Sequence, residues 1–415
     1  MIFLTLTEQR FIQENSNADP HTLLLRQTDS NNVRVKVVAA QLVSRQKARF
    51  KLPNWYANPE LVFPPALSVE QASSERTAAY KASLLNPGGA KPALVVDLTG
   101  GMGVDALAFS QQADRVIYVE QQTDLAELAA HNLPKLGGTN IDFPHQTEPG
   151  IPADRFLAQF TGPADWLYLD PARRDRQGGK VVRLEDCEPN VLDWYRPTHP
   201  TGWRQKATSV LLKTSPLIDI ETVMRQLPDV AAVHVVSVDN ECKEVLFVLT
   251  ANAGPDVTLQ TVNLRSTGAD EFFAFRRTEE RTAEVSFHDP MRYLYEPNPS
   301  LLKAGAFRIV AERLGLCKLA PNSHLYTSNE LVPDFPGRSF EVLGSCKPDR
   351  KEVQSFLPEH KANLSVRNFP EATETLRKKL GIATGGDLYL FATTLFDNKK
   401  RILITRKPIH PSLLS

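Results

Sequence analysis

The stretch Ala93-Leu-Val-Val-Asp97-Leu-Thr-Gly-Gly-Met-Gly103 decides the fold of this chain. A run of apolar residues that ends in an aspartate predicts a buried strand, and the glycines that follow predict a tight turn. Gly100, Gly101 and Gly103 carry no side chain, so a ligand can approach the main chain there. The helix expected next would offer its free N–H groups to an anionic group of that ligand. The stretch therefore predicts a strand, a ligand-binding loop and a helix.

Short apolar runs continue to alternate with helical stretches after this point, which is typical of a parallel α/β sheet. Helices are expected at residues 105–111 and 124–133. Strands are expected at residues 93–97, 115–120, 140–143, 165–170, 209–213, 230–238 and 244–249. Seven strands in this order predict an α/β fold with a Rossmann-like, doubly wound sheet.

The segments on either side have a different texture. Residues 1–88 should be mainly helical, with a helix-period pattern at 35–43 and one helix over 68–81. The part after residue 254 mixes short strands with helices, among them one helix over 299–314. We therefore expect a helical N-terminal domain at 1–88, the α/β domain at 89–254, and small α+β domains at 255–336 and 337–415.

Composition excludes several classes of protein. The formal net charge is zero, so any surface for nucleic acid must be local. The four cysteines stand far apart and form no metal-ligand spacing, so we expect neither disulfides nor a metal site. The N-terminus lacks the pattern of a signal peptide, and no apolar run approaches the roughly 18 residues of a membrane helix. These features predict a soluble, cytoplasmic protein.

Acidic residues at strand ends distinguish two classes of cofactor. Asp97 precedes the glycines, where its carboxylate suits the cationic methionine end of S-adenosylmethionine (SAM) and would repel a pyrophosphate. Glu120 ends the next strand and can accept hydrogen bonds from ribose hydroxyls. The spacing Gly101-x-Gly103-x-x-Ala106 also matches the looser dinucleotide fingerprint, so NAD or FAD is the alternative. The residues expected to bind SAM are Asp97, Thr99, Gly100, Gly101, Gly103, Glu120, Gln146 and Asp170.

A second motif, Tyr168-Leu-Asp-Pro-Ala-Arg-Arg174, ends the fourth strand and favours SAM. The proline gives a rigid exit that holds the Asp170 carboxylate near the transferring methyl group. Arg173 and Arg174 can clamp a phosphate or carboxylate, or else pair with neighbouring acids. Lys213 ends the fifth strand on the same edge and can hold the acceptor, or else lie on the surface. We expect Asp170, Arg173 and Lys213 to be the catalytic residues.

The acceptor is less defined by these residues. Methyltransferases that act on the amino groups of bases carry Asp/Asn-Pro-Pro-aromatic at this position, whereas this chain has Ala172 and Arg173. Asp-Pro-Ala-Arg also resembles the loop of RNA 5-methyluridine enzymes, which use a nucleophilic cysteine. Cys242, between the sixth and seventh strands, is a candidate thiol, and a buried structural cysteine is the alternative.

Further segments resemble one bacterial family of class I SAM-dependent methyltransferases along essentially the whole chain. These segments begin at Gln71-Ala-Ser-Ser, Leu212-Lys-Thr-Ser, Tyr295-Glu-Pro-Asn and Arg367-Asn-Phe-Pro. Members of that family carry a helical N-terminal part, a SAM domain, a ferredoxin-like domain and a C-terminal THUMP-like domain. Because true THUMP domains bind RNA, the resemblance implies an RNA substrate such as tRNA or rRNA.

Local charge near the C-terminus agrees with an RNA partner. Arg377-Lys-Lys379, Lys399-Lys-Arg401 and Arg406-Lys407 can neutralise phosphates, or else form a solvated surface. We therefore expect a SAM-dependent methyltransferase that acts on RNA through a basic C-terminal domain. The alternatives are a small-molecule methyltransferase and a SAM-binding, RNA-interacting protein without transfer activity. Nothing in the sequence indicates an oligomeric state.

Overall fold

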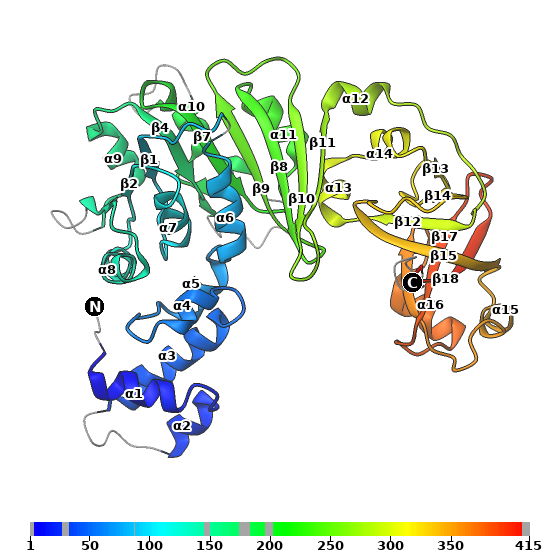
Figure 1. Ribbon diagram of the computed structural model, residues 1–415, viewed down its shortest axis with the longest axis horizontal. Helices are drawn as coiled ribbons and strands as arrows, with labels where there is room; N and C mark the ends of the chain where they lie inside the picture. Colours follow the sequence, from blue (N-terminus) through cyan, green and yellow to red (C-terminus); the bar gives the residue numbers. More distant parts are fainter. Residues whose placement is uncertain are drawn as a thin grey trace. The chain divides into compact units, whose positions relative to one another are not determined.

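A computed structural model of the chain describes residues 4–26, 33–86, 88–144, 150–173, 183–195 and 202–408 (Figure 1). The chain forms two compact units, which we treat one at a time. Unit 1 comprises Met1–Ala231 and Val245–Gly254, and unit 2 comprises Ala232–Glu244 and Pro255–Ser415. In the described parts, no helix is long and apolar enough to cross a membrane.

Unit 1 begins with helices, as expected. They are α1 (Leu6–Glu14), α2 (Pro20–Arg26), α3 (Val35–Ala48), α4 (Pro53–Ala57), α5 (Ala66–Gln71) and α6 (Glu75–Ser83). Val38 and Leu42 of α3 pack with Ile12 of α1 in a small apolar core.

The single helix expected over residues 68–81 is wrong, because the structure divides it into α5 and α6. Ser74 has an extended backbone and caps α6, since its side chain accepts a hydrogen bond from the Thr77 N–H at 3.1 Å. Serine favours this capping position over the interior of a helix.

A mostly parallel sheet follows in unit 1. Its strands are β1 (Leu94–Asp97), β2 (Arg115–Tyr118), β3 (Ile141–Asp142), β4 (Ala164–Leu169), β7 (Ala207–Thr214) and the unit 1 part of β9 (Glu241–Thr250). They lie in the order β3-β2-β1-β4-β7-β9, and only β9 runs antiparallel to its neighbour. The helices of this part are α7 (Val104–Ser110), α8 (Thr123–Asn132), α9 (Ala153–Gln159), α10 (Val191–Tyr195) and α11 (Ile220–Gln226).

This strand order confirms the predicted α/β class. All seven expected strands are present, with β8 (Val230–Val238) preceding β9. Although β9 comes after β8 in the chain, it is β9 that lies beside β7. β1 lies between β2 and β4: the chain runs from β1 through β2 to β3 on one side, and then crosses to β4 on the other side. Ligands of open α/β sheets bind at the carboxyl ends of strands where the order reverses in this way.

Unit 2 contains two groups of strands. In the first, β10 (Thr258–Leu264) pairs in parallel with β8 and antiparallel with β11 (Glu271–Arg276), and α12 (Arg277–Thr282) follows. The second is a sheet in the order β13-β14-β12-β15-β18-β17-β16. Its strands are β12 (Tyr293–Pro297), β13 (Cys317–Lys318), β14 (Tyr326–Ser328), β15 (Gly337–Cys346), β16 (Asn363–Arg367), β17 (Leu388–Thr394) and β18 (Lys400–Arg406). Its helices are α13 (Pro299–Ala304), α14 (Ile309–Arg313), α15 (Arg350–Gln354) and α16 (Thr373–Leu380).

The helix expected over residues 299–314 is also divided in the structure, into α13 and α14. Gly305 takes the left-handed conformation, with φ of 77°, and thereby ends α13. At the other end, the Asn298 side chain accepts a hydrogen bond from the Leu301 N–H at 3.1 Å. The Asn-Pro-Ser part of the segment that begins at Tyr295 is thus explained by the start of a helix.

Candidate cofactor and active site

The glycine loop joins β1 to α7 at the carboxyl end of the sheet. Gly100 fits closely here, because a Cβ at this position would lie 2.1 Å from Cε2 of Tyr118. Gly103 has a φ of 90° and stands directly before α7. Gly101 has a φ of 54°, and the nearest atom to an added Cβ is 3.8 Å away, so the loop is open on that side. The loop therefore leaves room for a ligand beside its backbone.

Asp97 ends β1 and is fully buried. Its Oδ1 accepts a hydrogen bond from the Thr99 N–H at 3.1 Å, whereas its Oδ2 has no hydrogen-bond partner among the described residues. Burial and then the nearby Asp105 carboxylate raise the pKa of Asp97 well above its ordinary value. An acid in such surroundings is stabilised by a cation, so the orphaned oxygen fits the cationic methionine end of SAM.

Glu120 lies two residues beyond β2 and shapes the same loop. Its carboxylate accepts hydrogen bonds from the N–H of Gly101 at 2.8 Å and from the N–H of Gln122 at 2.7 Å. The Tyr118 hydroxyl donates to the Gly101 carbonyl at 2.6 Å. Both oxygens of Glu120 therefore accept a hydrogen bond from a backbone N–H group, and each retains a lone pair for a further donor such as a ribose hydroxyl.

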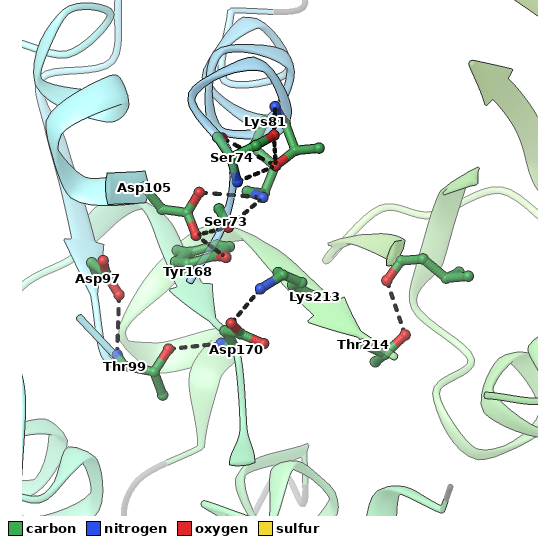
Figure 2. Close-up of polar contacts among 12 residues, drawn as sticks. Ser73, Ser74, Lys81, Asp97, Thr99, Asp105, Tyr168, Asp170, Lys213 and Thr214 are labelled. Carbon is green, nitrogen blue, oxygen red and sulfur yellow. Dashed lines mark hydrogen bonds and ion pairs between the residues drawn. The ribbon is translucent and has the colours of Figure 1, made fainter. Parts of the chain in front are cut away.

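Asp170 follows β4 directly and is connected to both neighbouring strands (Figure 2). Its backbone N–H donates to the Thr99 hydroxyl at 2.7 Å, which ties the Asp170 turn to the glycine loop. The Lys213 ammonium group, from β7, forms an ion pair with the Asp170 carboxylate. Lys213 is 11% exposed and Asp170 is 37% exposed, so the carboxylate faces solvent while the lysine supports it from within.

Sequence reasoning missed a buried polar network next to this edge (Figure 2). Asp105, in the first turn of α7, accepts hydrogen bonds from the hydroxyls of Ser73 at 2.8 Å and Tyr168 at 2.7 Å. Lys81 of α6 is fully buried, and its ammonium nitrogen lies 3.2 Å from Asp105 Oδ1. Burial opposes the charge of Asp105, but Lys81 and then Lys213 hold its pKa below the ordinary value. The one sequence signal was Lys81 itself, a lysine on the otherwise small-residue face of a helix.

Other predicted residues are placed differently or not described. Gln146 and Arg174 lie outside the described residues, and so does the side chain of Arg173, whose backbone pairs with Cys187 in a short ladder of β5 (Ala172–Arg173) and β6 (Cys187–Glu188). In unit 2, burial raises the pKa of the Cys242 thiol to about 11. This thiol therefore stays protonated at neutral pH, unlike a nucleophilic cysteine.

The basic residues near the C-terminus are partly neutralised. Four of them form ion pairs with nearby acids: Arg377 with Glu374, Lys379 with Glu371, Lys399 with Asp397 and Arg406 with Glu341. The predicted RNA patch thus carries less uncompensated charge than its sequence indicates.

The charge of the strand-end site discriminates between the two cofactors considered. Among the side chains that the structure describes here, carboxylates outnumber ammonium groups four to two: Asp97, Asp105, Glu120 and Asp170 against Lys81 and Lys213. A site with this balance attracts a cationic ligand and repels a pyrophosphate. Together with the strand order, these features define a class I SAM-dependent methyltransferase.

Comparison with known proteins places the chain within that class. A crystal structure of a methyltransferase from Porphyromonas gingivalis W83 has 33% sequence identity and a TM-score of 0.84, and the match covers 98% of this chain and 100% of that one. Two Mycobacterium tuberculosis proteins, from strains CDC 1551 and H37Rv, are named uncharacterised S-adenosylmethionine-dependent methyltransferases. Each is 24% identical over 337 residues, 79% of this chain and 83% of its own.

Two family models match in unit 2. Residues 293–336 match a ferredoxin-like domain, and residues 337–407 match a THUMP domain-like family. The chain therefore belongs to the same family as the Porphyromonas gingivalis protein, the class I SAM-dependent methyltransferases with ferredoxin-like and THUMP-like domains.

Proposed function

We propose that this methyltransferase transfers the methyl group of SAM to RNA, at the edge formed by Asp97, Glu120 and Asp170. The single observation that carries the site is the buried Asp97, whose Oδ2 has no partner among the described residues. The THUMP-like match over residues 337–407 supports RNA as the acceptor, because true THUMP domains bind RNA.

The residues at the loop have distinct roles in this proposal. Asp97 holds the cationic methionine end of SAM, Glu120 accepts from the ribose, and Thr99 with the three loop glycines lines the remaining surface. Gln146, which follows the third predicted strand in the sequence, contacts the adenine. SAM supplies a methyl group on a positively charged sulfur, which makes that carbon electrophilic.

Asp170 is the proposed contact to the acceptor. Its carboxylate is the more exposed partner of the ion pair with Lys213, so it can receive a hydrogen bond or a proton from the incoming nucleophile. Lys213 and the Thr99 hydroxyl fix Asp170 from two sides, and such orientation lowers the barrier to transfer. Arg173 is proposed to hold a phosphate of the acceptor.

We also propose the division into domains at 1–88, 89–254, 255–336 and 337–415. The two family matches end and begin at the boundary between residues 336 and 337, which supports this division there.

The test is the transfer of tritiated methyl groups from SAM to RNA from cells that lack the protein. A parallel reaction with a small-metabolite extract tests the alternative substrate class. Asp170→Asn should label RNA at least about 100-fold more slowly than wild type, with a smaller loss of SAM affinity than in Asp97→Asn. Asp97→Asn should lose SAM affinity itself.

The matched control is Asp114→Asn, which changes an exposed carboxylate in a surface ion pair and should label RNA normally. Label that enters only the metabolite extract would overturn RNA as substrate. The absence of any transfer by a SAM-bound protein would overturn the transfer reaction.

A further inference from the structure

The helical N-terminal part carries an unusual concentration of positive charge. Residues 33–59 contain six basic residues and no acid, although the whole chain has a formal net charge of zero. Within the fold, Arg34 pairs with Glu8, and Lys47 pairs with Glu70. Arg45 is buried and donates to backbone carbonyls such as that of Leu61, at 2.8 Å. The Lys51 ammonium group donates to the backbone carbonyls of Val69 at 3.1 Å and Glu70 at 2.6 Å, and Lys36 and Arg49 are exposed.

The turn after α3 displays an aromatic ring to solvent. Phe50 is 90% exposed, more than any other large apolar side chain that is exposed in the described residues. The Arg49 guanidinium lies 5.6 Å from the centre of this ring, and its other contact is the Asn17 amide oxygen at 3.3 Å. Neither partner cancels the charge of Arg49. We call Lys47, Arg49, Phe50 and Lys51 the Phe50 surface.

An exposed ring among cations matches the chemistry of single-stranded RNA. Bases stack on aromatic side chains, and lysine or arginine next to the ring binds the phosphates on either side. Double-stranded RNA offers its phosphates but hides its base faces, so the ring selects for unpaired nucleotides.

The Phe50 surface is also connected to the site. The Lys51 carbonyl accepts a hydrogen bond from the Glu75 N–H at 3.1 Å, and Glu75 is the first residue of α6. Six residues further along the same helix, Lys81 joins the buried network with Asp105. At 1.5 Å per residue this is about 9 Å along the helix axis.

We propose that the Phe50 surface binds a single-stranded segment of the RNA substrate, with one base stacked on Phe50 and a neighbouring phosphate held by Arg49. This inference rests on the proposed RNA methylation, but it concerns a separate surface from the THUMP-like domain. Charge complementarity and the free ring face favour RNA over a protein partner here.

The test uses the full-length protein and a fluorescein-labelled, single-stranded RNA of about 20 nucleotides, read by fluorescence anisotropy. Phe50→Ala should weaken binding roughly fivefold to 100-fold, and Phe50→Trp should retain it, because the larger ring still stacks. Arg49→Ala should reduce the salt dependence by about 0.7 in the slope of log affinity against log salt concentration. A hairpin RNA without unpaired bases should respond little to Phe50→Ala.

Phe396→Ala is the matched control, since that phenylalanine is 46% exposed within the THUMP-like segment. Unchanged RNA affinity in Phe50→Ala would overturn the inference, whether or not Phe396→Ala weakens binding. Loss of self-association in Phe50→Ala with unchanged RNA affinity would assign the surface to a second copy instead.

The two proposals fail separately. If Phe50→Ala transfers methyl groups to RNA with an unchanged KM, RNA methylation stands and the inference falls. If Phe50→Ala weakens RNA binding but neither the wild type nor any variant transfers a methyl group, the Phe50 surface is still an RNA-binding surface and the proposed methylation of RNA falls. Phe50→Ala, Phe50→Trp, Arg49→Ala and Phe396→Ala should bind SAM like wild type, which also shows that these variants are folded.

Discussion

Replacing Lys81 by methionine should strongly destabilise unit 1. Lys81 is fully buried, 3.2 Å from Asp105 Oδ1 and 3.0 Å from the Ser73 hydroxyl. Methionine keeps most of the side-chain volume but removes the ammonium group, so the buried Asp105 carboxylate loses its closest cation. Breaking a buried ion pair from one side costs about 3–5 kcal/mol. For a unit of this size, that corresponds to a fall of roughly 6–20 °C in Tm.

The assay is thermal and urea unfolding of the full-length protein at pH 7, followed by circular dichroism. Lys91→Met is the matched control, because Lys91 pairs with Asp114 at 2.8 Å on the surface, with side chains 51% and 65% exposed. This control should change the free energy of unfolding by no more than about 1 kcal/mol. The double variant Lys81→Met/Asp105→Asn should recover much of the loss, since it also removes the isolated carboxylate. Equal losses in Lys81→Met and Lys91→Met would refute the reasoning.

The pH dependence gives an independent check. In the wild type the pKa of Asp105 is lowered, so its contribution to stability is present at neutral pH and is lost only as the pH falls through that lowered pKa. In Lys81→Met the same carboxyl should have a raised pKa, because burial then dominates. The deficit of the variant should therefore shrink as the pH is lowered from 7 towards 5. A deficit that is constant over this range would contradict the explanation.

Three further changes test the loop and the thiol. Asp97→Asn should raise the free energy of unfolding without SAM by about 1–3 kcal/mol at pH 7. The pKa of Asp97 is raised in the fold, so its charged form destabilises the protein as the pH rises, and asparagine removes that charge. A Tm lower than that of wild type would contradict this. Gly100→Ala should cost about 1–3 kcal/mol, since its Cβ would collide with the buried Tyr118 ring. The control is Gly254→Ala, because a Cβ there meets no atom within 4 Å. Melting curves compare the two variants, and equal effects would argue against the collision. Cys242→Ser should leave methyl transfer unchanged, because the pKa of about 11 keeps the thiol protonated, and a 100-fold loss in initial rate would restore it as a candidate nucleophile.

Strand positions were predictable from the sequence, because a buried parallel strand needs a short apolar run and its ligand-binding end needs small or polar residues. The runs at Leu94–Asp97 and Ala164–Leu169 satisfy both conditions. The acids that follow them lie at one edge because parallel neighbours end together, as the pairing of Asp97 with both Tyr118 and Tyr168 requires.

Contacts between side chains that are far apart in the sequence were not predictable in the same way. Lys81 and Asp105 are 24 positions apart, and no local pattern marks them as an ion pair. Glu120 was expected to face a ligand, but it also accepts from the Gly101 N–H, a contact that depends on how the loop turns back over β2. The predictions of two helix ends were wrong for a local reason, since Ser74 and Gly305 interrupt apolar patterns that otherwise continue.

The sequence overestimates the uncompensated positive charge of the C-terminal strands, because it shows the basic clusters but not the acids with which they form ion pairs. Arg406 lies beside Glu341, which is 65 positions earlier in the chain and comes close only through the pairing of β15 with β18. Residues 33–59 contain no acid, yet Arg34 pairs with Glu8 and Lys47 with Glu70, so this segment too has partners elsewhere in the chain.

The most direct test of the central claim is a comparison of modified nucleosides, by mass spectrometry, in RNA from three strains. One strain carries the wild-type protein, one lacks it, and one carries Asp170→Asn at the same locus. The account predicts that one methylated nucleoside is lost in both altered strains and returns when the wild-type protein is restored. Identical nucleoside profiles in all three strains would contradict RNA methylation by this protein.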